Sequence, residues 1–305
     1  MLPFESEQSV ETSATAAESI HYCLENLVKQ NISTDAWEWL SQKASSVRQG
    51  DNKELNLAFA AIPRKTGKAP VRVPDTGLDN MNGLGQHFVI NRWTVDRLSR
   101  IWLLMQVPKD NRQEYVKGIE ALFSAAEMNE LAALYASLPF LSYPEQWRTR
   151  CAEGIRSNIG FVLEAIICFN PYPADQLDEK AWNQLVLKAF FTEKPVNEVI
   201  GLDERSNQEL ANTLCDYAHE RWAAGRQVNP FLWRCVAPFI NAENFADIRR
   251  VAASENPVDR EAAALTCYNS KYKPAQELLE NMNELKQLIE RGDLSWETVA
   301  QKVYV

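Results

Sequence analysis

Hydrophobic residues recur at helical spacing along most of the chain, and this pattern predicts amphipathic α-helices rather than strands. In the first half the predicted helices cover residues 15–30, 34–48, 53–61, 94–107, 111–126 and 127–141. The next apolar stretch predicts one long helix from about 145 to 169. Pro171 and Pro173 end it, because proline lacks a backbone donor and clashes with the preceding turn.

The same spacing continues to the end of the chain. Predicted helices cover residues 178–191, 206–224, 230–240, 243–254, 257–268, 275–291 and 295–303. The helix at 206–224 begins at Ser206 or Asn207, and Glu209 would complete a capping box with Ser206. Gly225 is placed to end that helix, since glycine readily adopts the left-handed conformation that follows a helix.

One segment breaks the pattern. Residues 63–93 are rich in proline, glycine and asparagine and show no helical period, which predicts a long irregular loop. The start of this segment is basic, with Arg64, Lys65, Lys68 and Arg72. Such a loop is either a solvated connection or a lid or clamp for an acidic ligand or partner.

These elements indicate an all-α fold of stacked antiparallel helix pairs, either a HEAT-like or irregular α-solenoid or a bundle. No residue-level repeat accompanies the pairs, so the pattern does not choose between these architectures. Only 11 glycines in 305 residues agree with a helical protein. We expect residues 1–14 to form a loose tail and residues 15–305 to form a single all-helical domain.

Composition narrows the functional classes. The chain carries 41 acidic and 32 basic residues, a formal net charge of −9, which disfavours broad nucleic-acid binding. The first residues lack the basic and apolar regions of a signal peptide, and the longest apolar run, at 159–169, is too short to cross a bilayer. Six cysteines without a CxxC pair are typical of buried free thiols. We therefore expect a cytoplasmic protein without direct membrane insertion.

The common catalytic and cofactor motifs are missing from the sequence. It has no GxGxxG, GxxxxGK[ST], GxSxG or HExxH. The histidines are His21, His87 and His219, and an acidic residue stands three positions before both His21 and His219, namely Glu18 and Asp216. A di-iron bundle would need two Glu-x-x-His pairs, and the pair at His219 has an aspartate in place of the glutamate. The sequence therefore predicts no metal site and no cofactor.

The segment "DYAHERWAAGRQVNPFLWRCV", residues 216–236, concentrates charged side chains around two tryptophans. On a helical wheel, Asp216, His219 and Glu220 lie on a polar border, whereas Arg221 falls within the apolar stripe. The polar border is either a solvated helix face or the lining of a groove. Arg221 must reach out to solvent or pair with a buried acid.

Two polar residues stand inside apolar helices. Glu164 has apolar helical neighbours on both sides, and Asn183 lies on a helix that is apolar around most of its circumference. A buried carboxylate must be paired, accept hydrogen bonds or become protonated. The candidate partners are arginines of the central region, namely Arg156, Arg205, Arg221 and Arg234. If several of these groups meet, they form one polar pocket in an apolar helical array.

The same central region is rich in aromatic side chains, which are either core packing or the wall of a site for a flat or prenylated small molecule. They are Tyr172, Trp182, Phe190, Phe191, Trp222 and Trp233. The candidate catalytic residues are Glu164, Asp216 and His219. The candidate binding residues are Tyr172, Trp182, Asn183, Arg205, Arg221, Trp233 and Arg234.

Several motifs of this region resemble the EboA-domain family. They are Asn170-Pro171-Tyr172-Pro173, Trp182-Asn183-Gln184, Gly201-Leu202-Asp203, Asp216 through Arg226, and Leu232-Trp233-Arg234. The upstream string "RSNIGFVLEAI" fits as well. Ala237 stands where the family pattern suggests glycine, a departure that affects local packing at most.

The resemblance implies a bacterial cytoplasmic protein encoded beside a set of ebo-cluster partners. These partners include a UbiA-type prenyltransferase, a TatD-like hydrolase and an enzyme like the sugar-phosphate cyclases. Such clusters are associated with making or exporting secondary metabolites, including scytonemin-type pigments. The resemblance assigns no catalytic residue.

Two functional hypotheses remain. The first is a non-enzymatic helical scaffold or small-molecule-binding accessory protein of such a pathway, with ebo-cluster proteins and a small-molecule metabolite as partners. The second is a novel metal-independent enzyme that uses Glu164, Asp216 and His219 as acid–base groups in a helix-lined pocket. The missing catalytic motifs favour the first hypothesis.

Overall fold

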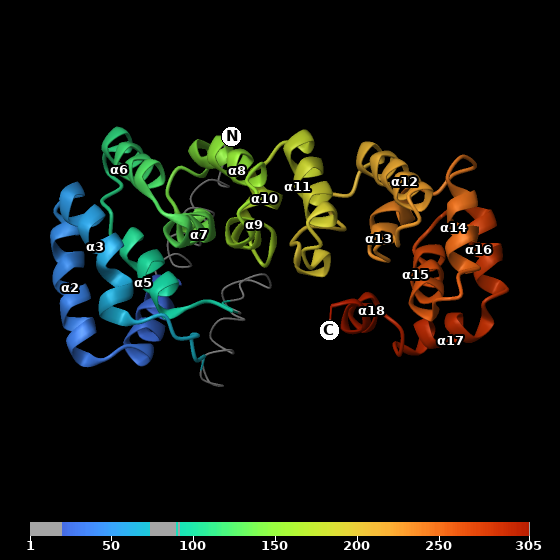
Figure 1. Ribbon diagram of the computed structural model, residues 1–305, viewed down its shortest axis with the longest axis horizontal. Coiled ribbons are helices and arrows are strands. Elements are labelled where there is room, and N and C mark those ends of the chain that lie inside the picture. The colour runs from blue at the N-terminus through green and yellow to red at the C-terminus, as the bar shows by residue number, and fades with distance from the viewer. Residues whose placement is uncertain (1–19, 74–89, 91, 305) are drawn as a thin grey trace, which may run out of the picture. The chain divides into compact units, whose positions relative to one another are not determined.

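The computed structural model describes residues 20–73, 90 and 92–304, which form α-helices and short 3₁₀-helices (Figure 1). This described part contains no strand, only an isolated antiparallel bridge between Pro70 and Thr94. The predicted all-α fold is confirmed. The tail expected at residues 1–14, His87 and most of the predicted loop lie outside the described residues.

The chain divides into two compact units, residues 1–176 and 177–305, which we call unit 1 and unit 2. Unit 1 contains a helix at residues 20–31, α2 (Thr34–Arg48), α3 (Asn52–Thr66), α5 (Val95–Leu104), α6 (Arg112–Ala125), α7 (Met128–Ala136), η1 (Leu138–Phe140), η2 (Pro144–Trp147), α8 (Arg148–Ile155), α9 (Gly160–Ile167) and α10 (Tyr172–Gln176). The single domain expected over residues 15–305 stays a prediction.

Unit 2 contains the remaining helices, most of them short. They are α11 (Glu179–Phe191), η3 (Val196–Glu198), α12 (Gln208–Ala223), α13 (Leu232–Val236), η4 (Ala237–Phe239), α14 (Phe245–Ala252), α15 (Pro257–Tyr268), α16 (Lys273–Glu280), α17 (Asn283–Arg291) and α18 (Trp296–Val303). Helix α15 is central to this unit, because it packs against α13, α14, α16 and α18.

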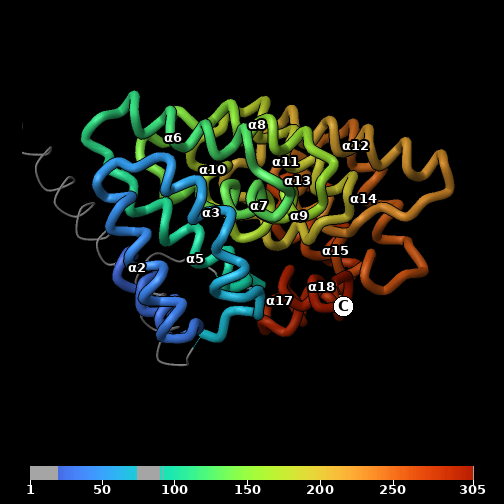
Figure 2. Tube along the Cα trace, turned by 60° about the vertical axis from the view of Figure 1, so that its left-hand side comes forward, coloured from blue at the N-terminus to red at the C-terminus, as the bar shows by residue number. Residues whose placement is uncertain are grey.

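Consecutive helices pack as antiparallel neighbours where a tight turn joins them. Ser33 and Asp51 cap α2 and α3, each accepting a hydrogen bond from a backbone N–H of the first turn. Gly50 reverses the chain between the two helices with a φ of 86°, a conformation that glycine adopts without strain. Helices α2, α3 and α5 consequently lie side by side (Figures 1 and 2).

Each unit has its own apolar core, built around tryptophans. The indoles of Trp102 and Trp147 are fully buried in unit 1, and those of Trp182 and Trp233 are fully buried in unit 2. A buried indole removes a large apolar area from water, which is the main driving force of folding. Within the described residues, no helix combines the length and the apolarity that a membrane crossing requires.

The long helix predicted from about 145 to 169 is wrong, because the chain breaks between α8 and α9. At the break the Ser157 hydroxyl accepts a hydrogen bond from the Ile159 N–H at 3.0 Å, a local bond that competes with the helical pattern. The two helices then pack closely at Gly154, where a Cβ atom would lie 2.4 Å from Ile166 Cδ1. A continuous helix could not make that contact.

Other details of the helices also differ from the prediction. Residues 275–291 form two helices, since Met282 adopts a ψ of 43° between two asparagines, whose amides compete with helical hydrogen bonds. Asn207 rather than Ser206 caps α12, so the capping box with Glu209 does not form. Helix α3 continues through Pro63 to Thr66, which is beyond the predicted start of the loop.

Candidate functional site

A half-open cavity of about 670 Å³ lies in unit 2, beside the segment that links α12 to α13. Helix α12 contributes Trp222 and α13 contributes Trp233. The remaining wall comes from α14, α15 and the end of α18. A cavity of this size falls in the range of small-molecule sites, which is about 300–1,000 Å³.

The linking segment is shaped by the end of α12. Gly225 has a φ of 65°, its N–H donates to the Trp222 carbonyl at 3.0 Å, and the Arg226 N–H donates to the Arg221 carbonyl at 2.8 Å. These two bonds form a Schellman motif, which satisfies the last carbonyls of the helix and turns the chain sharply. The turn leaves Trp222 and Arg226 on the cavity wall. Gly225 as the end of this helix, predicted from the sequence, is confirmed.

Stacked side chains form one wall of the cavity. The Trp222 and Trp233 rings are nearly parallel, with an interplanar angle of 21° and centroids 5.6 Å apart. The guanidinium carbon of Arg250, on α14, lies 4.1 Å from the centroid of the Trp222 ring. A cation over an indole face is attracted by the ring quadrupole. This contact fixes the position of an otherwise exposed arginine.

The charges around the cavity differ in how far they are paired. Lys302 Nζ lies 2.7 Å from both carboxylate oxygens of Glu261. Asp259 accepts a hydrogen bond from the Ser254 hydroxyl at 2.8 Å. Within the described part of the chain, no carboxylate lies at ion-pair distance from Arg226 or Arg250. Two cations of the wall are therefore available to a ligand.

A second, smaller cavity of about 340 Å³ shares the linking segment and contains Arg221. The Arg221 Nε donates to the Gln227 carbonyl at 2.8 Å, and its guanidinium lies over the Tyr217 ring at 5.9 Å. The Tyr304 hydroxyl also lines this cavity and accepts a hydrogen bond from the Asn229 amide at 3.0 Å. Arg221 therefore holds the linking segment in place.

The three candidate catalytic residues do not share a described cavity. Asp216 and His219 are exposed on α12, and His219 Nε2 lies 2.8 Å from Asp247 Oδ1. Glu164 is half-buried in unit 1, where burial lowers the pKa of Arg97 and the charge of Glu164 opposes that shift. Among the described residues, no group of three or more His, Cys, Asp or Glu side chains has a metal-binding arrangement.

Three of the candidate binding residues meet at the start of α12. Asn183 Nδ2 donates to Asn207 Oδ1 at 3.2 Å, and Asn207 Nδ2 donates back to Asn183 Oδ1 at 2.8 Å. Arg205 donates to the Leu177 carbonyl at 2.8 Å, and its guanidinium lies 5.1 Å from the centroid of the buried Trp182 ring. These contacts tie α11 to α12 and leave the amide of Asn183 paired.

The remaining candidates lie apart from this cluster. Arg234 forms a two-pronged ion pair with Asp203, at 2.7 and 2.6 Å. Tyr172 is buried in unit 1, and its hydroxyl donates to the Pro144 carbonyl. Trp233 is the candidate binding residue that lines the larger cavity.

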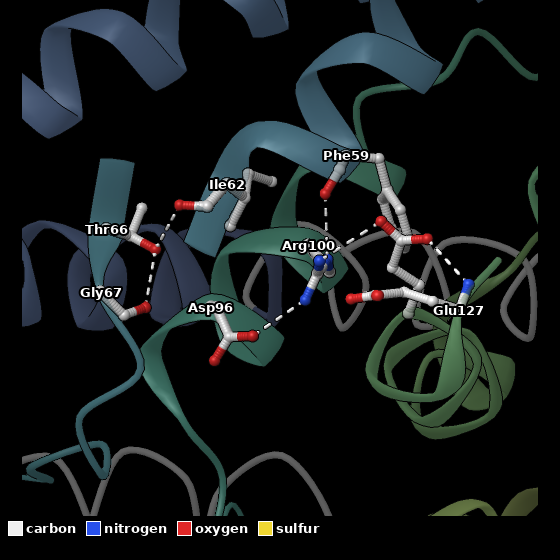
Figure 3. Close-up of polar contacts among 8 residues, drawn as sticks. Phe59, Ile62, Thr66, Gly67, Asp96, Arg100 and Glu127 are labelled. Carbon is white, nitrogen blue, oxygen red and sulfur yellow. Dashed lines mark hydrogen bonds and ion pairs between the residues drawn. The ribbon is translucent and has the colours of Figure 1, made fainter. Parts of the chain in front are cut away.

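A buried ion cluster in unit 1 was not predicted. Arg100 is fully buried on α5, with Nη1 2.8 Å from Asp96 Oδ2 and Nη2 3.5 Å from Glu130 Oε1 (Figure 3). Its Nε donates to the Phe59 carbonyl at 3.0 Å. That carbonyl would normally accept from the residue four positions later, which is Pro63 and has no N–H. Arg100 therefore donates to the Phe59 carbonyl the hydrogen bond that Pro63 cannot supply.

Sequence reasoning also missed the arginines of the cavity. Arg226 belongs to the family-like motif but was given no role, and Arg250 sits in an ordinary amphipathic helix. The local signal was the doublet Arg249–Arg250, which lies inside the helix predicted at 243–254 and in the last turn of α14. Its contact with Trp222 joins residues far apart in the chain, which no local pattern reveals.

Comparison with known proteins identifies a family. The family model described as metabolite traffic protein EboA matches residues 20–237 of the chain. Curated proteins and solved structures give no match. The match covers unit 1 from residue 20 and extends into unit 2 as far as α13. The motifs shared with the EboA-domain family thus belong to a similarity over most of the sequence, and the chain is a member of the EboA family.

Proposed function

We propose that this protein binds a small metabolite in the cavity of unit 2 and holds it without transforming it. The observation that carries the proposal is the cavity itself, a volume of about 670 Å³ walled by stacked indoles and a few polar groups. Pockets of this kind bind small molecules. A carrier of this type agrees with the family description of metabolite traffic.

The groups of the cavity wall favour binding over catalysis. Among the lining residues that the structure describes, Asp259 is the sole carboxylate, and none is a histidine or cysteine. Asp259 is already hydrogen-bonded to Ser254. General acid–base catalysis needs a proton donor and an acceptor within reach of the substrate. The cavity offers anchoring groups, whereas neither Asp216 nor His219 lines it, although the His219 ring packs against that of Trp222.

The wider role stays a proposal. A protein that holds a metabolite would pass it to the partners that the family resemblance implies, such as the prenyltransferase-like and TatD-like proteins of ebo clusters. A secondary-metabolite pathway and a cytoplasmic location fit that role.

The test is to purify the protein from its producer and identify the bound small molecule by native mass spectrometry. We expect a molecule to be recovered with the wild type and lost in V258F, because Val258 lines the cavity and a phenyl ring would fill it. The matched control is V116F, a half-exposed valine on α6 of unit 1, which should retain the molecule.

Two results would contradict the proposal. One is recovery of the same molecule from V258F in wild-type amounts. The other is conversion of the recovered molecule by the purified protein, which would favour the enzyme hypothesis.

A further inference from the structure

The sign of charge at the cavity is opposite to that of the chain. The whole protein has a formal net charge of −9, whereas the cavity wall carries three cations, Arg226, Arg250 and Lys302, against one carboxylate, Asp259. Glu261, outside the wall, pairs with Lys302. The excess positive charge of the wall therefore resides on the two arginines. A local field of this sign attracts anions to an acidic protein.

Arg250 is positioned to bind an anion. Its guanidinium lies against the face of Trp222, with 4.1 Å between the guanidinium carbon and the ring centroid. The five N–H donors of a guanidinium point outward from its edge in several directions, so those turned away from the ring are free to bind a carboxylate or phosphate. Because Trp222 is itself stacked on the buried Trp233, the guanidinium is held in place before a ligand arrives.

Apolar side chains also line the cavity. Besides the two indoles they are Val228, Pro230, Val251, Val258 and Val303, and they alternate with the uncharged polar residues Gln227, Ser254 and Asn256. The apolar area favours a hydrocarbon or aromatic body. The cavity thus combines apolar and uncharged polar side chains with a cationic edge.

We propose, resting on the function proposed above, that the ligand is a small amphipathic anion. Its apolar or aromatic body lies against the valines and indoles, and its carboxylate, sulfate or phosphate group is bound by Arg250, with Arg226 as the second cation. The shared chemistry is one anionic group on an apolar body of metabolite size.

The experiment compares three probes of one shape by isothermal titration calorimetry with the full chain. The probes are 2-naphthylacetate, the neutral 2-naphthylacetamide and the cationic 2-(2-naphthyl)ethylammonium. We expect the anion to bind at least about tenfold more tightly than the amide, since charge-assisted hydrogen bonds are about twice as strong as neutral ones. The ammonium should bind most weakly.

Variants then assign the contact. R250Q should lower the affinity for the anion about tenfold and leave the affinity for the amide unchanged, which also shows that the cavity is still formed. The matched control is R249Q, because Arg249 is equally an exposed arginine on α14 but packs over Phe245, outside the cavity wall. R249Q should bind all three probes like the wild type.

Each failure has a distinct meaning. Equal binding of anion and amide by the wild type, or unchanged anion binding by R250Q, would overturn the anion inference and leave the binding function standing. If R250Q bound neither the anion nor the amide, Arg250 would only support the structure of the cavity wall. No binding of any probe up to about 1 mM would overturn the proposed cavity function as well.

Discussion

Arg100 and Arg250 show how environment divides one residue type into two roles. Arg100 is fully buried, and its charge is matched by Asp96 and Glu130. Burial lowers the pKa of Arg100, and the nearby carboxylates, Asp96 first, oppose that shift. Arg250 is exposed and lies over the indole of Trp222. No carboxylate of the described residues lies at ion-pair distance from its guanidinium. The first arginine is occupied by the fold, and the second is free for a ligand.

Arg100→Met should destabilise unit 1 strongly. The variant leaves Asp96 and Glu130 buried without their cation and the Phe59 carbonyl without its donor, and breaking a buried pair costs about 3–5 kcal/mol. Urea denaturation of the full chain measures the change. As a control, Arg112→Met removes an exposed pair with Glu145 and should cost at most about 1 kcal/mol. Equal losses in the two variants would contradict the structural role of Arg100.

His219→Ala should leave ligand binding intact. His219 is exposed and does not line the larger cavity. Its loss removes a surface contact with Asp247 and a ring contact with Trp222, whose position is still held by Trp233 and Arg250. Calorimetry with the naphthyl anion should give the wild-type affinity, and the bound metabolite should still be recovered. A large loss of either, or of any activity found in the protein, would instead support the acid–base role predicted from the sequence.

At the residue scale, the sequence predicted where polar groups interrupt apolar helices but not what they contact. Asn183 was expected to be buried and hydrogen-bonded, and it is. Its partner Asn207 was identified only as a possible helix cap, because a pairing between two helices leaves no trace in local spacing. Pro63 was predicted to begin the loop, whereas α3 continues through it, and the Phe59 carbonyl that Pro63 cannot pair accepts from Arg100 of another helix.

At the element scale, the start of α12 depends on a cap that is itself supported. Asn207 Oδ1 accepts from the Leu210 N–H at 2.9 Å, while the same amide exchanges two hydrogen bonds with Asn183 on α11. The cap therefore serves two purposes, because it begins one helix and fixes its angle to another.

Asn207→Ala should consequently cost more than the loss of an ordinary cap. Losing a cap costs about 0.5–2 kcal/mol, and leaving the buried Asn183 unpaired adds about 1–3 kcal/mol. Asn256→Ala is the matched control, since Asn256 caps α15 with one hydrogen bond, to the Val258 N–H, and is exposed. Thermal unfolding of both variants compares them. A smaller shift in melting temperature for Asn207→Ala would refute the coupling between α11 and α12.

Helix positions followed from the sequence wherever apolar spacing and a capping residue coincided. The helices predicted at 34–48 and 257–268 have the same bounds in the structure. The failures came where an apolar run continued across a break, at Ser157 and at Met282. In both places a local side-chain or backbone preference breaks the helix although the apolar period continues. A helical wheel shows only the period and therefore misses the break.

At the scale of the whole molecule, the cavity combines segments of different origin. Trp222, Arg226 and Trp233 lie within the part of the chain that matches the family, residues 20–237. Arg250, Val258 and Lys302 come from helices beyond that part. A prediction that relied on the family-like motifs could therefore find only one side of the site. The anion-binding group proposed here belongs to the other side.

The buried thiols report on the unfolding of each of the two units. Burial raises the pKa of Cys151, Cys215, Cys235 and Cys267 to about 12. Because the thiolate is the reactive form, these four groups should resist alkylation at pH 8 until their surroundings unfold. An unfolded thiol has a pKa of about 8.5, so the chain releases protons on unfolding and its stability should fall as the pH rises above that value.

Pulse alkylation at increasing urea, read by peptide mass spectrometry, follows each thiol separately. Cys215, Cys235 and Cys267 belong to unit 2 and should become reactive at one common urea concentration, since a compact unit unfolds cooperatively. Distinct urea midpoints among these three thiols would show that residues 177–305 do not unfold as one cooperative unit. Cys151 reports on unit 1. If it shares their midpoint, the chain behaves as the single domain predicted from its sequence, and a separate midpoint would establish two domains.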